Sequence, residues 1–120
     1  MEAGKIHTAD LQEFWTEERC FITELMNTVD APAASLALCR VEPGVTTQWH
    51  CLNVTEWYIV SQGRGLMALD EQEPFEIRPG DCVQIPAKAA QRVSNIGSED
   101  LIFKCLCMPR FTPESYEALE

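Results

Sequence analysis

The sequence predicts an all-β fold, an antiparallel barrel or sandwich formed by a single domain. The first observation is a series of short apolar, strand-like runs along most of the chain. The second is that glycine, proline, asparagine or aspartate separates successive runs, as in turns between strands. The third is that 120 residues are enough for one domain with one modest core.

The expected strands follow one another from residue 20 to residue 108. They cover residues 20–25, 34–41, 46–52, 56–61, 66–69, 74–77, 82–85, 91–94 and 101–108. Tight turns are expected at Pro43–Gly44 and at 78–80, where glycine and proline supply the unusual backbone angles. Thr112 followed by Pro113 is typical of a helix start and predicts a short C-terminal helix.

The first 19 residues differ from the rest, because they are polar with only scattered apolar positions. We expect them to form an arm across the barrel, or a short helical turn. The predicted organisation is therefore an N-terminal arm at residues 1–19 and a barrel domain at residues 20–120.

Charge and composition exclude several classes of partner. The chain carries 9 Lys+Arg against 19 Asp+Glu, a formal net charge of −10. Such a surface repels phosphate, so neither nucleic acid nor an anionic membrane is expected as a partner. The polar N-terminus lacks a signal-peptide pattern, and no apolar run approaches the ~20 residues that span a bilayer. We therefore expect a cytoplasmic protein whose six cysteines are reduced thiols.

Two segments carry the most specific signal. The first begins at Gly44 and ends at Gly63, with His50 and Glu56 evenly spaced between them. The second contains Gly80, Pro86 and Asn95. This pair of segments resembles the two signature motifs of the cupin superfamily, across roughly residues 34–110. The resemblance implies a double-stranded β-helix of the cupin type, which is an antiparallel barrel or jelly roll, and it also implies a homodimer.

The resemblance also implies a metal site with a reduced set of ligands. In the family pattern, two histidines, a glutamate and a further histidine point into the barrel. Here His50 and Glu56 match, whereas Leu52 stands at the second histidine and Gln91 at the last one. The implied cofactor is one divalent metal (Fe, Mn, Ni or Zn) on His50, Glu56 and Gln91. Such a set is poorer in imidazole than usual iron or zinc sites.

Three classes of function follow from this ligand set. The chain could be a small metal-dependent enzyme of the dioxygenase, isomerase or decarboxylase class that binds a small molecule in the barrel. It could be a metal-free binding or sensing module without catalysis, or a purely structural protein. Without metal, His50 and Glu56 could still act as acid and base, because burial shifts both pKa values toward neutrality.

Strand periodicity assigns further side chains to the two faces. Tyr58 and Val60 share the parity of Glu56, so we expect them to line the ligand pocket together with Leu52. Cys105 and Cys107 share one face of the last strand, where a thiolate could join His50 if that face is internal. The runs at 57–60 and 101–103 are apolar on both faces, which predicts an outer contact and hence a homodimer.

Overall fold

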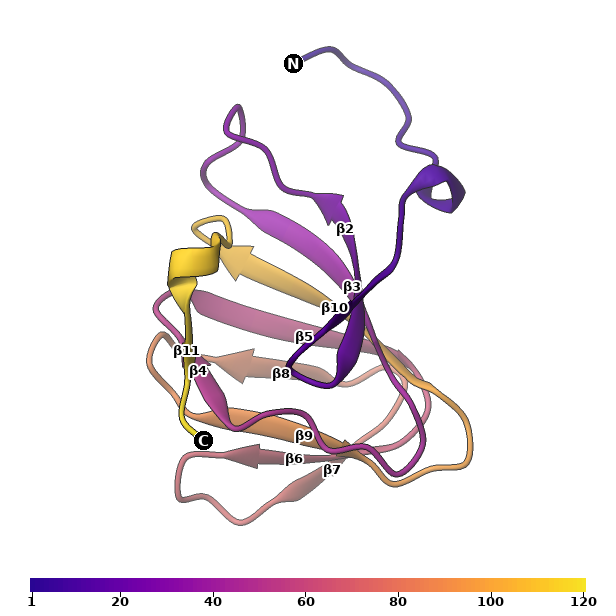
Figure 1. Cartoon of the computed structure of the whole chain (residues 1–120), viewed down its shortest axis with the longest axis vertical. Coiled ribbons are helices and arrows are strands. Elements are labelled where there is room, and N and C mark those ends of the chain that lie inside the picture. The colour runs from indigo at the N-terminus through magenta and orange to yellow at the C-terminus, as the bar shows by residue number, and fades with distance from the viewer.

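The computed structural model describes all 120 residues and is built almost entirely of short strands (Figure 1). They are β1 (Phe14–Thr16), β2 (Cys20–Met26), β3 (Ser35–Val41), β4 (His50–Leu52), β5 (Thr55–Gln62), β6 (Gly65–Leu69), β7 (Phe75–Ile77), β8 (Cys82–Ile85), β9 (Gln91–Asn95), β10 (Leu101–Met108) and β11 (Tyr116–Ala118). Two single 3-10 turns, η1 (Thr8–Asp10) and η2 (Pro113–Ser115), complete the secondary structure. The predicted all-β class is confirmed.

The strands form two antiparallel sheets that close on each other as a barrel (Figure 1). One sheet has six strands in the order β1-β2-β3-β10-β5-β8, and the other has five in the order β11-β4-β9-β6-β7. Strands distant in sequence therefore lie side by side. His50 of β4 pairs with Gln91 of β9, and Cys107 of β10 pairs with Glu56 of β5. This pairing brings the two predicted motifs together.

Alternate side chains along the strands point inward and fill the interior of the barrel. On β10 the residues at 101, 103, 105 and 107 are buried, and the residues between them are partly or fully exposed. Phe103 is 2% exposed and stacks on Tyr58 of β5 with ring centroids 4.2 Å apart. Around this pair lies a single large hydrophobic cluster that both sheets contribute to. Part of this cluster also lines the cavity described below.

One motif glycine is required by a close approach of two backbones. Gly63 directly follows β5 with φ +85°, a conformation that residues other than glycine rarely adopt. A Cβ atom there would lie 2.7 Å from the carbonyl oxygen of Asp100. The glycine in the first motif thus sets the turn that lets β5 pass the start of β10.

The predicted C-terminal helix is wrong. Thr112 and Pro113 do start a helical turn, in which the Ser115 amide donates to the Thr112 carbonyl oxygen at 2.8 Å. The turn ends at once, because Tyr116 to Ala118 pair with β4 as strand β11. The edge strand β4 offers hydrogen-bond partners to the backbone of this segment. These bonds take the place of the ones that a further helical turn would have formed.

The N-terminal segment is partly built into the barrel. Residues 14–16 form β1, which pairs with β2 at the edge of the larger sheet. The residues before β1 extend away from the barrel (Figure 1). No helix in this structure has the length and apolar character needed to cross a bilayer. All six cysteines are free thiols.

The outer face of the larger sheet keeps apolar residues in partial contact with solvent. Ile59 of β5 is 42% exposed, and Trp57 on the same face is half-buried and donates its indole N–H to Gln84. These residues are consistent with the apolar outer run seen in the sequence. Dimerisation through this face stays a prediction.

Candidate functional site

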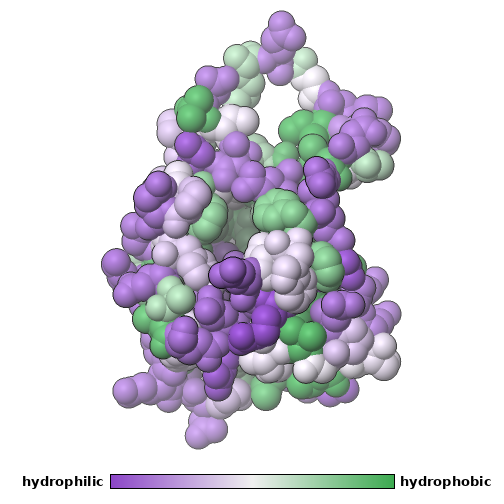
Figure 2. Space-filling model, in the orientation of Figure 1, coloured by the Kyte–Doolittle hydropathy of each residue, from purple (hydrophilic) through white to green (hydrophobic).

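A cavity of about 470 Å³ opens into the barrel between the C-terminal segment and strands β2 and β3. Figure 2 shows this hollow, with hydrophobic surface at its sides and strongly hydrophilic residues along part of its rim. More than half of the residues in its wall are hydrophobic. A pocket of this size and composition is typical of small-molecule sites in proteins.

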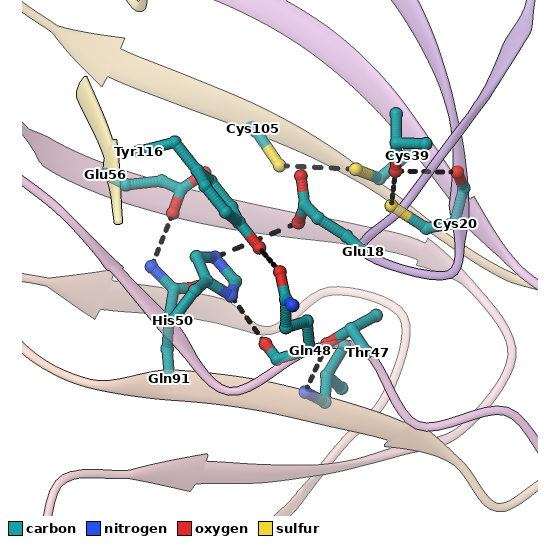
Figure 3. A network of polar contacts seen from close by, with 12 residues as sticks. Glu18, Cys20, Cys39, Thr47, Gln48, His50, Glu56, Gln91, Cys105 and Tyr116 are labelled. Carbon is teal, nitrogen blue, oxygen red and sulfur yellow. Dashed lines mark hydrogen bonds and ion pairs between the residues drawn. The ribbon is translucent and has the colours of Figure 1, made fainter. Parts of the chain in front are cut away.

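His50, the first residue of β4, places its imidazole in the cavity wall (Figure 3). Its Nδ1 lies 2.6 Å from the carbonyl oxygen of Gln48. A carbonyl can only accept, so Nδ1 carries the proton and Nε2 carries the lone pair. The side chain is 4% exposed, and burial lowers the pKa of His50 below its ordinary value. The histidine is therefore neutral near pH 7, with a basic nitrogen available to a ligand.

Tyr116 fixes this imidazole by a stacking contact and by a hydrogen bond to its neighbour Gln48. Tyr116 of β11 stacks on the His50 ring, with centroids 4.8 Å apart and planes 18° from parallel. The Tyr116 hydroxyl donates to the side-chain oxygen of Gln48, whose backbone carbonyl accepts from His50. The C-terminal strand, which the sequence suggested as a helix, thus supplies the residue that orients the histidine.

Glu56 lies at the end of a buried polar chain (Figure 3). The Tyr58 hydroxyl donates to Gln91 Oε1 at 2.6 Å, and Gln91 Nε2 donates to Glu56 Oε1 at 2.8 Å. Burial raises the pKa of Glu56 to about 7, because little water is present to solvate its charge. The carboxyl group is thus poised to gain or lose a proton near neutral pH.

Glu18 is a site residue that the sequence did not reveal. It lies in the turn between β1 and β2, and its Oε1 stands 3.8 Å from His50 Nε2 (Figure 3). Its backbone carbonyl accepts from the Gln48 amide at 3.0 Å, which ties the turn to the histidine strand. Burial, and secondarily the charge of Glu56, raises the pKa of Glu18 to about 7. A glutamate in a polar arm carries no spacing signal that could have marked it.

The other predicted pocket residues lie as follows. Leu52 and Tyr58 line the cavity, whereas Val60 is buried in the core cluster and is not part of the cavity wall. Cys105 and Cys107 both face the cavity. Cys107 Sγ lies 3.9 Å from Glu56 Oε2, and burial raises the pKa of its thiol to about 12. The thiol is therefore protonated at neutral pH.

Comparison with known proteins gives the family. Residues 37–108 match the family model described as the cupin domain. The chain belongs to the cupin family. An uncharacterised protein of Methanocaldococcus jannaschii is 34% identical to this cupin over 123 aligned residues, which cover the whole chain and 98% of the relative. That relative carries no described function.

Solved structures show the same fold. A Streptomyces PAC13 variant solved with uridine superposes on this cupin with a TM-score of 0.82 and 16% identity, covering the whole chain and 93% of PAC13. The polyketide cyclase RemF of Streptomyces resistomycificus gives a TM-score of 0.84 at 18% identity, over 99% of this chain and 87% of RemF. At this identity the likeness establishes the fold alone.

The divalent metal implied by the family does not fit the residues present. Both polar atoms of the Gln91 amide are already bonded to Tyr58 and Glu56. Leu52 offers no donor atom where the family pattern has an imidazole. No group of three or more His, Cys, Asp or Glu side chains in the structure could hold a metal ion. His50 and Glu56 alone make a poor donor set for iron or zinc.

The two buried carboxyl groups predict that this cupin is more stable in mild acid. The ordinary pKa is 4.5, and in the fold both pKa values rise to about 7. Between these pH values the folded state therefore binds more protons than the unfolded one. The stability that the two carboxyl groups contribute is fully present below about pH 4.5 and is lost as pH rises through about 7. Glu56 contributes on the order of 2–3 kcal/mol to this pH-dependent part of the free energy of unfolding. Glu18 contributes less, because its side chain is 25% exposed.

Melting temperatures measured between about pH 8 and pH 5 test this expectation. The melting temperature should rise by several degrees toward pH 5, and a Glu18→Gln/Glu56→Gln double variant should show a much flatter profile. A wild-type profile that falls toward pH 5, or one that the double variant shares, contradicts the assignment.

Proposed function

We propose that this cupin is an enzyme that moves protons on a small organic molecule held in the cavity, through its own side chains. The observation that carries the proposal is the His50 imidazole. It is buried, it holds its proton on Nδ1, and its unprotonated Nε2 faces the carboxyl group of Glu18 at 3.8 Å. A basic nitrogen beside an acidic group of near-neutral pKa is the arrangement that general acid–base catalysis needs.

The residues support a simple proton cycle. His50 Nε2 accepts a proton from a carbon or hydroxyl of the ligand, and the Nδ1 bond to the Gln48 carbonyl stabilises the resulting imidazolium. Glu18 or Glu56, in its protonated form, donates a proton at a neighbouring atom of the ligand. His50 then returns its proton to the glutamate. One proton leaves the ligand and one is added, so the reaction class is isomerisation and no co-substrate is consumed.

The cavity wall supports the binding of an organic ligand. Phe103, Tyr58 and Tyr116 place aromatic rings in the wall, and aliphatic and thiol side chains occupy much of the rest. Burial of an apolar body against such a wall supplies binding energy, and the few polar groups fix its orientation. Of the structural neighbours, PAC13 is solved with uridine and RemF is a polyketide cyclase, so this fold accommodates organic molecules in other proteins.

Deuterium exchange tests the proposal. A panel of small ketones, with phenylacetone among them, is incubated with the protein in D₂O, and loss of the α-proton signal is followed by NMR. We expect exchange that His50→Gln slows about 100-fold, as for removal of a general base. His7→Gln makes the same change at the only other histidine, in the exposed arm, and should leave the rate unchanged.

Two outcomes would contradict the enzyme proposal. If the His50→Gln variant exchanged deuterium as fast as the wild type, His50 would not be the catalytic base. If EDTA abolished the exchange and added manganese restored it, the reaction would depend on a metal. Saturable binding of the panel without exchange would instead favour the second candidate, a metal-free binding or sensing module. The same hydrogen-bond acceptors and apolar wall would serve that function.

A further inference from the structure

The charged groups of the cavity wall are all of one sign. The wall contains four glutamates and neither lysine nor arginine. The glutamates are Glu17, Glu18, Glu24 and Glu56. Glu56 is 7% exposed, and its oxygens contact the neutral groups Gln91 and Cys107. The protein itself thus supplies no cation to balance these carboxyl groups.

The nearest cation turns away from the cavity. Arg19 directly follows Glu18, yet its φ of +73° directs its side chain outward. Its guanidinium donates to the Thr46 carbonyl oxygen at 2.8 Å and pairs with Glu120 at 2.9 Å. A positive φ is unfavourable for arginine, so the turn adopts a costly geometry in which Glu18 faces the cavity and Arg19 does not.

One uncharged acceptor of the wall, the Nε2 atom of His50, has no hydrogen-bond donor. His50 Nε2 belongs to a side chain that is 4% exposed and makes no hydrogen bond, only the 3.8 Å approach to Glu18. The Gln48 side-chain oxygen accepts from Tyr116, and the Gln48 backbone oxygen accepts from His50. The acceptors that the wall leaves free for a ligand are therefore the His50 ring nitrogen and carboxylate oxygens, beside the amide N–H donors of Gln48.

Aromatic rings line the same cavity. Phe14, Tyr58, Phe103, Phe111 and Tyr116 all contribute to the wall. The face of an aromatic ring carries negative electrostatic potential and attracts cations, most strongly where water is excluded. Carboxylates, a ring nitrogen and aromatic faces all favour positive charge, and the net charge of −10 adds to the same field.

We infer that the cavity binds an organic cation, a protonated amine on an apolar body, with its ammonium group between Glu18, Glu56 and His50. The inference rests on the proposed function only in placing the ligand in this cavity, and it names the class of that ligand. The ammonium group donates to the carboxylates and lies beside the His50 ring, whose Nε2 stays free for the rest of the ligand, and the apolar body lies against the aromatic wall. Carboxylic acids and phosphates are repelled by the same carboxylates.

Three probes of one size test the charge preference. Benzylamine, benzyl alcohol and benzoate share a phenyl ring and differ in the charge of one short substituent. Each is titrated into the full chain at about pH 8 and low salt, and binding is followed by NMR chemical shifts. We expect benzylamine to bind at least about tenfold more tightly than benzyl alcohol, and benzoate to bind most weakly. Alcohol or benzoate binding as tightly as the amine overturns the inference.

A pair of matched variants locates the preference. Glu18→Gln removes one negative charge inside the cavity and should reduce the advantage of benzylamine over benzyl alcohol about tenfold. Glu42→Gln removes one charge at an exposed position outside the cavity wall and should leave that advantage intact. An unchanged advantage in Glu18→Gln would overturn the placement of the amine beside Glu18. An equal loss in both variants would show that net charge and not this site attracts the amine.

The probe order is independent of turnover. Amine preference without deuterium exchange on the ketone panel would refute the proposed enzyme and leave the ligand class standing. Exchange that depends on His50, together with no preference for the amine, would support the enzyme and refute the ligand class.

Discussion

Replacing Gln91 by leucine is expected to destabilise the fold by about 2–5 kcal/mol. Gln91 is fully buried, and its amide is the only link between the Tyr58 hydroxyl and the Glu56 carboxyl group. Leucine has similar volume but no polar atom, so a buried donor and a buried acceptor both lose their partner. Each such loss costs about 1–3 kcal/mol, a large share of the 5–15 kcal/mol that stabilises a typical domain.

Chemical denaturation of the Gln91→Leu variant measures this loss, and Gln84→Leu is its matched control. Gln84→Leu makes the same change of chemistry at an exposed position of β8, where the Gln84 side-chain oxygen accepts from Trp57 at 3.3 Å. Water can replace that partner, so the control should lose less than about 1 kcal/mol. If the two variants were equally stable, the chain from Tyr58 through Gln91 to Glu56 would not contribute to the fold.

Replacing Phe103 by alanine should destabilise the fold by about 3–5 kcal/mol. Phe103 is among the largest side chains with almost no exposure, and its ring stacks on Tyr58. It also separates the packed core from the cavity, because it belongs to both the core cluster and the cavity wall. Its loss leaves a void that the surrounding strands can fill only in part, and it frees the Tyr58 ring that holds Gln91.

Phe75→Ala is the control for this variant. Phe75 begins β7 at the edge of the smaller sheet and is 36% exposed, so the same truncation should cost about 1 kcal/mol. Thermal and denaturant unfolding of both variants gives the comparison. A Phe103→Ala protein as stable as Phe75→Ala would mean that the barrel collapses around the missing ring, and the cavity would then have to shrink.

The sequence located a large part of the site because its signals are local. The resemblance to the family motifs placed His50, Glu56 and Gln91 on strands whose inner faces meet. His50 of β4 and Glu56 of β5 do line one cavity, whereas Gln91 of β9 is buried outside its wall and donates to Glu56. Alternation identified the inner face of each strand, since side-chain direction in a strand depends only on parity. The sequence also shows where the chain departs from the family pattern, at Leu52 and Gln91. This departure explains why the available ligand residues do not fit a metal.

Other features depended on how distant segments meet. The segment after Pro113 has a helix-start pattern, but its backbone pairs with β4 because that edge is open to it. Tyr116 therefore stacks on His50, a contact between residues far apart in sequence that no local pattern encodes.

By itself, the sequence determined the all-β class, the family motifs, the inner faces of the strands and the absence of a full set of imidazole ligands. These follow from residue type and short-range periodicity. Only the tertiary structure decided that Glu18 joins His50, that Gln91 is held between Tyr58 and Glu56, and that the wall has carboxyl groups without a cation. Such properties arise when the closure of two sheets fixes distances between side chains that the chain order leaves free.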